Sequence, residues 1–423
     1  MQRFVRCFVA ALLFAATAAL PAVTMACPVK IGAVLPLTGP LAPVVAAMFT
    51  SAQISLDQIN AAGGVLGCQA VLVVRDSQAQ PSVAVDAAHQ LIDLEGVRVI
   101  VGGVISSDAL AMLNSATLPA KVPLISPTAS SPTFSEIGGR TGLFFRTNAS
   151  DALQGVAAAA EAAASKNGRV AVLAVNNDWG TNLSKLFRTA YERFGGTVTK
   201  IVLYNQDQSS YRAEVTSALA DKPDTLYLIG YATEGARIAR DWISQGGTQR
   251  FMFAHNMNDA AFVRGVGANY LAQAVWLTPG STETASLSEF RTAYATRTGK
   301  PAEGPGRTGI YDAVALAAMA IQAAHGDSDG PAIAAGFHRA TDPKGMTVYA
   351  GEKGFHDALA ALADGKPVNY AGATGPLEFD ANGDIAIPFV KWALDSAGGL
   401  QITGHMSVEE VLALRMKLLA AVN

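Results

Sequence analysis

The chain has 423 residues, of which 50% are apolar and 15% charged, and its formal net charge is −3. This length suits two or three domains with large buried cores, and the apolar content excludes a disordered or collagen-like chain. The sequence also lacks the clustered lysines and arginines of a nucleic-acid-binding protein, so we expect no nucleic-acid partner. A mean hydropathy of +0.26 makes a membrane span the first feature to test.

The N-terminus has the pattern of an exported protein. Arg3 and Arg6 precede an uncharged apolar stretch at 7–20, which is shorter than the ~20 residues that a membrane helix needs. The small residues Thr24 and Ala26 then provide a cleavage site. We therefore predict a secretory signal peptide over residues 1–26 and a soluble, exported protein, with an N-terminal membrane anchor as the alternative.

Two cysteines, Cys27 and Cys68, remain after this cleavage, as expected for a protein of an oxidising compartment. Each comes just before a predicted strand, at Val29–Leu35 and 69–75. If these are neighbouring parallel strands, the cysteines lie at the same edge of the sheet and can form a disulfide, which would stabilise the fold by roughly 4 kcal/mol. The alternative is a lipid anchor on Cys27, but lipidation signals usually have leucine at the position of Thr24.

The first part of the chain alternates short apolar runs with longer helical stretches. This alternation predicts a parallel sheet with helices on both faces. We expect strands at Val29–Leu35, 69–75, 97–101 and 123–126, and helices at 44–59, 81–95 and 108–120.

The same pattern restarts at Asp151, without a Pro/Gly/Ser-rich linker near 144–148, so we expect two α/β units packed as a pair. Two helices and two strands follow the second unit. The second unit and these later elements comprise helices at 151–166, 179–194, 210–220, 233–245, 287–296 and 311–324, and strands at Arg169–Val175, 198–203, Thr225–Ile229, 251–254, 274–277, 375–380 and 387–394.

Motifs of catalysis or metal binding are scarce. The sequence has no HExxH, no CxxC and no phosphate loop ending in GK[ST], and its six histidines are scattered. Residues 380–384 resemble the first half of a calcium loop, but Lys391 stands where the bidentate Glu is required, so a turn between two strands is favoured. We expect no enzyme, no metal and no cofactor.

Hydroxyl-bearing loops follow three strands of the first unit. In parallel sheets, ligands bind beyond the carboxyl ends of the strands, where this chain has Thr38, Ser106 and Ser107, and the 128–131 loop. A helix N-terminus exposes unpaired N–H groups, so a small carboxylate or carbonyl oxygen could dock at Ser106 and Ser107. The alternative is that these residues only cap helices.

Several stretches, taken in order, resemble one known family. These proteins are the periplasmic solute-binding proteins of branched-chain amino acid and amide ABC transporters, of the leucine/isoleucine/valine-binding type. The similarity runs through essentially the whole chain after the predicted signal peptide. It is carried by residues 30–40 (KIGAVLPLTGP), 57–67 (DQINAAGGVLG), 106–107 (SS), 125–130 (ISPTAS), 145–147 (FRT) and 311–313 (YDA).

The resemblance implies a type I periplasmic-binding fold: two doubly wound, parallel-sheet α/β lobes joined by three chain crossings, which close on a ligand like a flytrap. The expected lobes are residues 27–147 with 281–373, and 148–280 with 374–423. It also implies a monomeric, non-catalytic carrier that delivers its solute to an inner-membrane permease driven by cytoplasmic ATPases.

The resemblance also assigns ligand-binding residues on the first lobe. It places the ligand carboxylate at the hydroxyl and N–H of Ser106, with Ser107 beside it. It places the ligand amino group near Thr128 and Ser130.

On the second lobe, Trp179 and Tyr231 would cover the ligand, and an acid would bind the amino group. That acid aligns with Asn256, whose neutral amide cannot neutralise an ammonium group. Glu234, Asp108 or Asp259 are candidate substitutes. An α-amino acid, a neutral amide and a carboxylic, even aromatic, acid therefore all remain open as ligands. Two functional alternatives also remain: a ligand-sensing receptor of the same fold, and an exported hydrolase.

Overall fold

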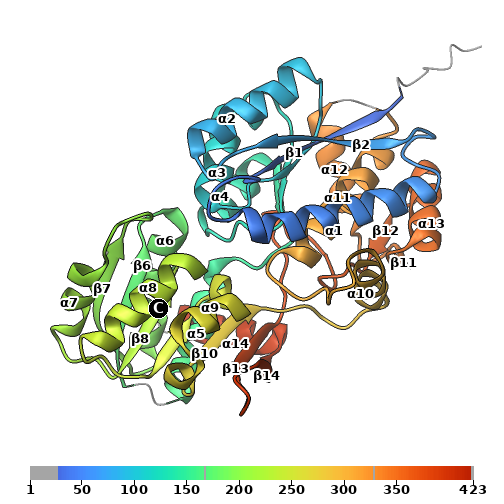
Figure 1. Ribbon diagram of the computed structural model, residues 1–423. Coiled ribbons are helices and arrows are strands. Elements are labelled where there is room, and N and C mark those ends of the chain that lie inside the picture. Colours follow the sequence, from blue (N-terminus) through green and yellow to red (C-terminus); the bar gives the residue numbers. More distant parts are fainter. Residues whose placement is uncertain (1–26, 166–167, 327–328, 421–423) are drawn as a thin grey trace, which may run out of the picture.

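The computed structural model describes residues 27–165, 168–326 and 329–420, and the predicted signal peptide at 1–26 lies outside them. The chain forms two lobes that lie side by side, each built around its own sheet (Figure 1). The predicted architecture of two α/β lobes, each with its own sheet, is therefore confirmed.

The first lobe is built on a parallel sheet with the strand order β2-β1-β3-β4-β5 in the described part of the chain. The parallel pairing agrees with the predicted architecture. The last strand was not predicted, because it ends in Arg146, a charged residue that is buried here only through its ion pair with the distant Asp384. The strands are β1 (Val29–Leu35), β2 (Ala70–Asp76), β3 (Ile100–Gly102), β4 (Leu124–Ser126) and β5 (Phe144–Arg146).

Helices cover both faces of this sheet, as the apolar strands require. Consecutive residues of β5 show the two faces: Phe144 stacks on Phe134 with ring centroids 4.4 Å apart, and Phe145 packs on Phe337 at 4.5 Å. The helices of this lobe are α1 (Ala42–Ala61), α2 (Pro81–His89), α3 (Ser106–Met112), α4 (Thr133–Thr141), α10 (Ala285–Thr298), α11 (Arg307–Ala323), α12 (Gly330–Ala340) and α13 (Glu352–Ala363), with the small paired strands β11 (Met346–Val348) and β12 (Val368–Tyr370).

Helix α4 was not predicted, because it contains Gly138 and Gly139, which disfavour helix. The structure shows why Gly138 is there: a Cβ atom at this position would lie 2.0 Å from the carbonyl oxygen of Asn382. Close packing of two distant segments therefore requires glycine at this position, although glycine has a low helix propensity.

The second lobe has a sheet with the order β14-β13-β10-β9-β8-β6-β7. The strands from β10 to β7 are parallel, as predicted, but β13 and β14 add an antiparallel edge that was not predicted. The predicted strand at 375–380 is wrong, since this segment holds only an isolated bridge between Ala371 and Pro376. The strands are β6 (Arg169–Val175), β7 (Thr197–Tyr204), β8 (Thr225–Ile229), β9 (Phe251–Phe253), β10 (Val275–Pro279), β13 (Phe389–Leu394) and β14 (Leu400–Met406).

Helices also cover this second sheet (Figure 1). The final helix, α14, packs against α5 and so belongs to the same lobe. The helices are α5 (Asp151–Ala164), α6 (Asp178–Arg193), α7 (Arg212–Leu219), α8 (Ala232–Ser244), α9 (Ala260–Val266) and α14 (Val408–Ala420).

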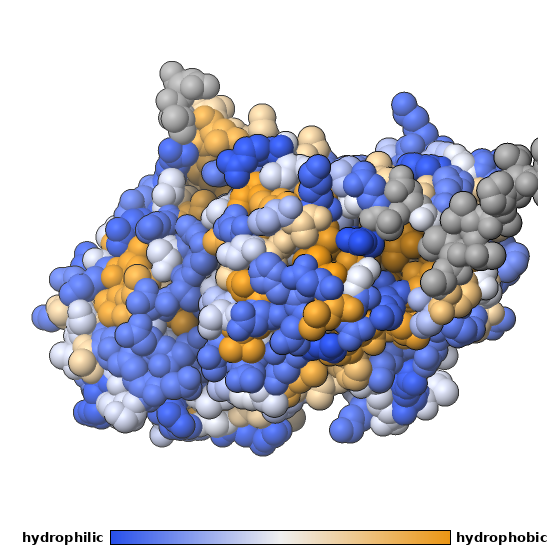
Figure 2. Space-filling view, turned by 90° about the horizontal axis from the view of Figure 1, so that it is seen from above, coloured by the Kyte–Doolittle hydropathy of each residue, from blue (hydrophilic) through white to orange (hydrophobic). Residues whose placement is uncertain are grey.

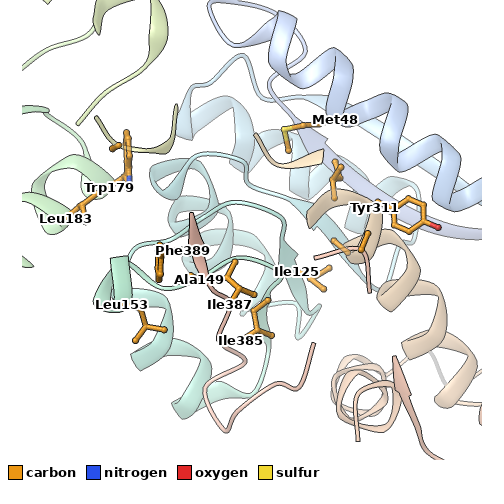
Figure 3. Close-up of a cluster of buried hydrophobic side chains, with 14 of the residues drawn as sticks. Met48, Ile125, Ala149, Leu153, Trp179, Leu183, Tyr311, Ile385, Ile387 and Phe389 are labelled. Carbon is orange, nitrogen blue, oxygen red and sulfur yellow. The ribbon is translucent and has the colours of Figure 1, made fainter. Parts of the chain in front are cut away.

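Three crossings join the lobes: one after β5, one after β10, and one between β12 and β13. The first and third run together, because Ala149 and Ile385 form a parallel bridge. Figure 3 shows that Ala149, Ile385, Ile387 and Phe389 extend the hydrophobic core between the lobes. The two units therefore pack as a pair, as predicted from the missing linker.

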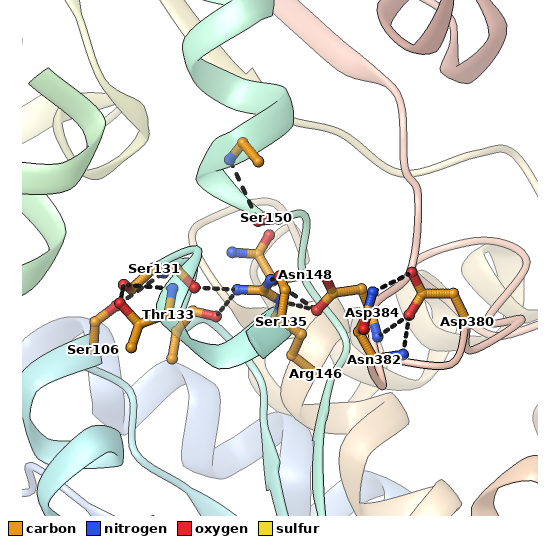
Figure 4. Close-up of polar contacts among 12 residues, drawn as sticks. Ser106, Ser131, Thr133, Ser135, Arg146, Asn148, Ser150, Asp380, Asn382 and Asp384 are labelled. Atoms are coloured by element: carbon orange, nitrogen blue, oxygen red, sulfur yellow. Dashed lines mark hydrogen bonds and ion pairs between the residues drawn. The ribbon is translucent and has the colours of Figure 1, made fainter. Parts of the chain in front are cut away.

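A buried arginine holds the crossings together (Figure 4). The side chain of Arg146 is 0% exposed and pairs with the Asp384 carboxylate at 2.7 Å. It also donates to the Ser131 carbonyl oxygen and the Ser135 hydroxyl, both at 2.9 Å. Asp384 lies in the turn at 380–384, so the turn predicted for this calcium-like segment is present, and its last carboxylate binds the first crossing.

The third crossing begins at another buried carboxylate. Asp312 of α11 accepts hydrogen bonds from the Tyr370 hydroxyl at 2.9 Å and from the backbone N–H groups of Ala373 and Thr374 at 2.8 and 2.7 Å. Burial raises the pKa of Asp312 to about 6 in spite of these bonds. The YDA motif therefore has a structural role, since its aspartate anchors the crossing to the first lobe.

The predicted disulfide between Cys27 and Cys68 is present. Its basis was also correct: β1 and β2 are parallel neighbours, and Val29 pairs with Ala70, which places the two preceding cysteines at one edge with Cα atoms 5.4 Å apart. A sulfur in a disulfide cannot also carry a lipid, so this bond favours the disulfide over a lipid anchor on Cys27.

No helix among the described residues is long and apolar enough to cross a membrane. On the face shown in Figure 2, hydrophilic residues predominate and hydrophobic residues form separate patches. The high mean hydropathy therefore has its source in the buried sheets and helices of both lobes, together with the apolar N-terminal stretch.

Candidate ligand-binding site

A pocket of about 840 Å³, its open mouth included, lies between the two lobes. Its walls are loops at the carboxyl ends of parallel strands: those after β1, β3 and β4 on the first lobe, and those after β6, β7, β8 and β9 on the second. This is the edge at which parallel α/β sheets bind ligands. Both lobes are needed to enclose the space.

Most of the predicted site residues meet in this pocket. Ser107 does not line it, and neither does Thr38. The predicted residues that line it are Ser106, Thr128 and Ser130 from the first lobe and Trp179, Tyr231 and Asn256 from the second. Their role in binding stays a prediction, but the structure brings them together.

The hydroxyl groups of the first lobe are positioned by the loops after β3 and β4. Ser106 begins α3, and no side chain caps that helix, so Ser106 and Ser107 are not capping residues in this structure. The Ser106 hydroxyl has only a long contact, accepting from the Ser131 N–H at 3.4 Å. The Thr128 hydroxyl donates to the Val104 carbonyl oxygen at 2.7 Å, so it can still accept a hydrogen bond from a ligand.

Three rings form the wall on the second lobe. Trp179 lies between Tyr231 and His255, with ring centroids 5.4 and 5.2 Å away. The Nδ2 group of Asn177 donates to the Tyr231 hydroxyl at 3.2 Å and fixes that ring. Burial lowers the pKa of His255 to about 4, so this ring is neutral near pH 7 and contacts Gln154 through Nδ1 at 3.1 Å.

The apolar floor of the pocket was missed in the sequence. It comes from Leu41, the N-cap residue of α1, and from Val44, Val45 and Met48 in the first two turns of that helix. These positions follow the i, i+3, i+4, i+7 spacing of one helix face, so the signal was present. This spacing indicated an ordinary core face, because a single sequence does not distinguish a helix face that lines a pocket from one that packs against the protein core.

One carboxylate lines the pocket. Glu234 follows Tyr231 by three residues, in the first turn of α8, and is 7% exposed. The other candidate acids lie elsewhere: Asp108 accepts from the Ser77 hydroxyl beneath the first lobe's surface at 3.0 Å, and Asp259 caps α9. Neither lines the pocket.

A second buried acid lies behind the pocket. Asp151, at the start of α5, is 0% exposed, and neither carboxylate oxygen has a hydrogen bond of good geometry, although Ser130 and Trp179 lie beside it. Burial raises its pKa to about 7, against the attraction of Arg146. Near neutral pH this residue is therefore partly protonated.

Asp151→Asn should stabilise the protein more at pH 8 than at pH 5. The pKa of Asp151 is about 7 in the folded chain, above its ordinary value of 3.8. The free energy of unfolding therefore falls as the pH rises from about 3.8 to above about 7. Asparagine has the same shape without the charge, so we expect its stabilising effect to be larger at pH 8 than at pH 5 by about 1 kcal/mol or more. Thermal unfolding at both pH values, with the exposed Asp221→Asn as control, measures this. An equal effect at both pH values would contradict it.

Within residues 27–165, 168–326 and 329–420, no group of three or more His, Cys, Asp or Glu side chains is placed to hold a metal ion. The arrangement that is present offers hydroxyl and N–H groups on one side, aromatic rings on the other, and an apolar floor. Such a site can enclose a small organic molecule with one or two polar ends.

Comparison with known proteins identifies the family. Residues 28–382 match the family described as periplasmic binding protein. The chain belongs to this family. The match covers most of the chain and confirms the resemblance drawn from the sequence motifs. Periplasmic binding proteins bind solutes and are not enzymes, which confirms the expectation that the chain is not an enzyme and leaves the hydrolase alternative without support.

Individual family members agree with this assignment. The chemotactic signal transduction system substrate-binding protein BasB of Halobacterium salinarum is 26% identical over 385 residues, 88% of each chain. The leucine-binding protein LivK of Thermotoga maritima has a TM-score of 0.74 at 23% identity, covering 90% of this chain and 99% of its own. A solute-binding protein of an ABC transporter from R. palustris, in complex with benzoate, has a TM-score of 0.72 at 17% identity, covering 90% and 96%. The two structures establish the fold.

Proposed function

We propose that this periplasmic binding protein is the extracytoplasmic solute-binding component of an ABC importer. It captures a small organic solute between its lobes and delivers it to an inner-membrane permease driven by cytoplasmic ATPases. One observation carries the proposal: a pocket that residues of the strand-end loops line from both lobes. A solute that contacts both walls binds the closed arrangement more tightly than the open one and so shifts the chain towards closure.

The lobes of the proposed closure are residues 27–147 with 281–373, and 148–280 with 374–420. Beside the pocket, Asn182 on α6 of the second lobe donates to the Ser131 hydroxyl of the first lobe at 3.4 Å. The three crossings act as the hinge, and Arg146 ties the first to the third. Closure then brings the rings of the second lobe onto a solute held by the hydroxyls of the first.

The relatives support two kinds of solute. LivK of Thermotoga maritima is a leucine-binding protein, and the R. palustris protein holds benzoate. Both solutes pair a carboxylate with an apolar body. In this chain the N–H groups at the start of α3 and the Ser106 hydroxyl would bind the carboxylate, and the Trp179–Tyr231 wall and the α1 floor would bind the body.

The test is a thermal-shift screen of the chain without residues 1–26 against amino acids, amides and aromatic acids, followed by calorimetry on the hits. Combining Ser106→Ala with Ser130→Ala should weaken binding by about 10-fold or more, because each hydrogen bond lost to a charged group is worth ~1.5–3 kcal/mol. Ser107→Ala is the matched control and should leave affinity unchanged, since Ser107 does not line the pocket. Unchanged affinity in the double variant would refute this site.

A ligand-sensing receptor is the second candidate function. It is favoured by BasB, which is named as a substrate-binding protein of a chemotactic signal transduction system and aligns over 88% of this chain. The pocket would be the same, and only the membrane partner would differ. Deleting the gene in its source cell separates the two: loss of uptake of the identified solute indicates a carrier, and loss of the swimming response with intact uptake indicates a sensor.

A further inference from the structure

The indole of Trp179 differs from the other indoles of the chain. The chain has four tryptophans, all within the described residues. The Nε1 atom of Trp179 is buried and has no hydrogen bond of good geometry. An indole N–H group can only donate, so this residue of the pocket needs an acceptor from its surroundings. The other three donate from Nε1: Trp242 to the Thr248 carbonyl oxygen at 2.8 Å, Trp276 to the Met257 carbonyl oxygen at 2.9 Å, and Trp392 to the Thr278 hydroxyl at 3.1 Å.

The carboxyl group of Asp151 lies where such an acceptor is needed. Its side chain is 0% exposed, and Trp179 and Ser130 lie beside it. Helix α5 begins at Asp151 and packs against α6, which carries Trp179 as its second residue. The backbone N–H of Asp151 also donates to the Ser130 carbonyl oxygen at 2.7 Å, which holds the loop after β4 against the start of α5. One buried carboxyl group therefore lies between a pocket residue of the first lobe and one of the second.

We infer that Asp151 is a positioning residue of the pocket: its ionised carboxylate accepts from the Trp179 indole with one oxygen and from the Ser130 hydroxyl with the other. The two oxygens have no other hydrogen bond among the described residues, so both are available. Two acceptors then match two donors that come from opposite walls of the pocket.

The hydroxyl of Ser130 has a single hydrogen, and Asp151 sets its direction. While that hydrogen points at the ionised carboxylate, Ser130 presents only oxygen lone pairs to the pocket and accepts from a solute. A protonated Asp151 donates instead, which frees the Ser130 hydrogen for an acceptor on the solute. This inference rests on the proposed function and adds a determinant of specificity to it: the protonation of one residue outside the pocket decides which polar group Ser130 prefers.

The charges around Asp151 place this change near neutral pH. Burial raises the pKa of Asp151 to about 7, the Arg146 guanidinium on β5 opposes this rise, and Asp178 on α6 adds to it. The other titratable groups beside Asp151 and Trp179 stay neutral near pH 7, because burial shifts the pKa of each away from that range: His255 down to about 4, and Tyr227 and Tyr231 upwards.

The test follows the four indole N–H resonances of the free protein by nitrogen–proton correlation NMR between pH 5 and pH 9. Trp179→Phe identifies the Trp179 resonance by its absence. The titration is repeated for Asp151→Asn, for Ser130→Ala, and for Ser107→Ala as the matched control, since Ser107 does not line the pocket. The other three indole resonances show whether each variant is folded, because their acceptors lie elsewhere in the chain.

We expect the Trp179 resonance to titrate with a midpoint near pH 7 and to lose this titration in Asp151→Asn. Ser130→Ala should raise the midpoint by about 0.5 pH unit or more, because the ionised carboxylate loses a donor, and Ser107→Ala should leave it unchanged. A Trp179 resonance that does not respond to pH, a titration that persists in Asp151→Asn, or equal midpoints in Ser130→Ala and Ser107→Ala would each overturn the inference. These measurements need no solute, so the proposed function fails separately, if the wider screen finds no solute whose binding depends on Ser106 and Ser130.

Discussion

Arg146→Met should lower the free energy of unfolding by about 3–5 kcal/mol, because it leaves the Asp384 carboxylate without its partner in a nearly dry hinge. The guanidinium of Arg146 is 0% exposed, and Asp384 is 14% exposed. The loss extends beyond the ion pair, since the Ser131 carbonyl oxygen and the Ser135 hydroxyl also lose their donor. Ser131 belongs to the loop after β4 that carries Ser130, and Ser135 lies in the first turn of the following helix α4. Solute affinity should therefore fall as well.

Urea or thermal unfolding measures the effect, and a surface arginine supplies the control. Arg291 is 42% exposed and pairs with Glu283 and Glu303, so Arg291→Met removes an ion pair of similar distance from water-exposed surroundings. It should cost less than about 1 kcal/mol. Arg146→Lys should not restore stability, because an ammonium group cannot reach the several acceptors that the planar guanidinium fork binds together. Equal losses in Arg146→Met and Arg291→Met would show that burial adds nothing to this pair.

Trp179→Ala should reduce solute affinity by roughly 30-fold or more, about 2 kcal/mol, as expected for a large aromatic side chain at the centre of a binding surface. Trp179 is 3% exposed, lines the pocket, and holds Tyr231 and His255 at its two sides. Removing it takes away the central part of the aromatic wall and loosens the other two rings. Stability should fall too, by about 3–5 kcal/mol, because a buried aromatic leaves a cavity.

A second tryptophan provides the control that distinguishes a loss of stability from a loss of solute binding. Trp242 on α8 is 0% exposed, packs away from the pocket, and donates from Nε1 to the Thr248 carbonyl oxygen at 2.8 Å. Trp242→Ala should destabilise the chain by a similar amount and leave solute affinity within about 2-fold of the wild type. If either alanine variant fails to fold, Trp179→Leu and Trp242→Leu allow the same comparison. Equal loss of affinity at both positions would mean that Trp179 acts only through stability.

Helices and strands were predicted correctly where the local sequence pattern and the tertiary environment agree. The strands Val29–Leu35, Arg169–Val175 and Thr225–Ile229 were predicted with their observed bounds, because strands buried on both faces are continuous apolar runs ended by polar or turn residues. Helix α4 and strand β5 failed for the opposite reason. Their residues were selected by contact with the third crossing, as Gly138 shows, and such contacts leave no periodic signal.

The residues of the binding site were likewise predictable only where the local sequence pattern was sufficient. Alternating strands and helices imply which loops share the binding edge, and with the family resemblance Ser106, Thr128 and Ser130 in those loops could be named in advance. Which of Ser106 and Ser107 lines the pocket could not be predicted, because neighbouring helix residues point about 100° apart and the rotation of α3 about its axis is set by its packing. The position of Glu234 relative to Asn256 was equally undecided, since the two lie on different loops whose spacing depends on the packing of β8 and β9 with their helices.

By itself the sequence determined two α/β units, one pair of cysteines at a shared strand edge and a set of polar loops, and it predicts an export signal. Each of these depends on short-range order: hydrophobic period, charge placement, or a fixed offset from a strand. Tertiary structure decided the rest. It paired Arg146 with Asp384 across 238 positions, gathered Trp179, Tyr231 and His255 into one wall, and buried Asp151 beside Ser130 and Trp179. Such features depend on which distant side chains share a dry space, and only the packed lobes determine that.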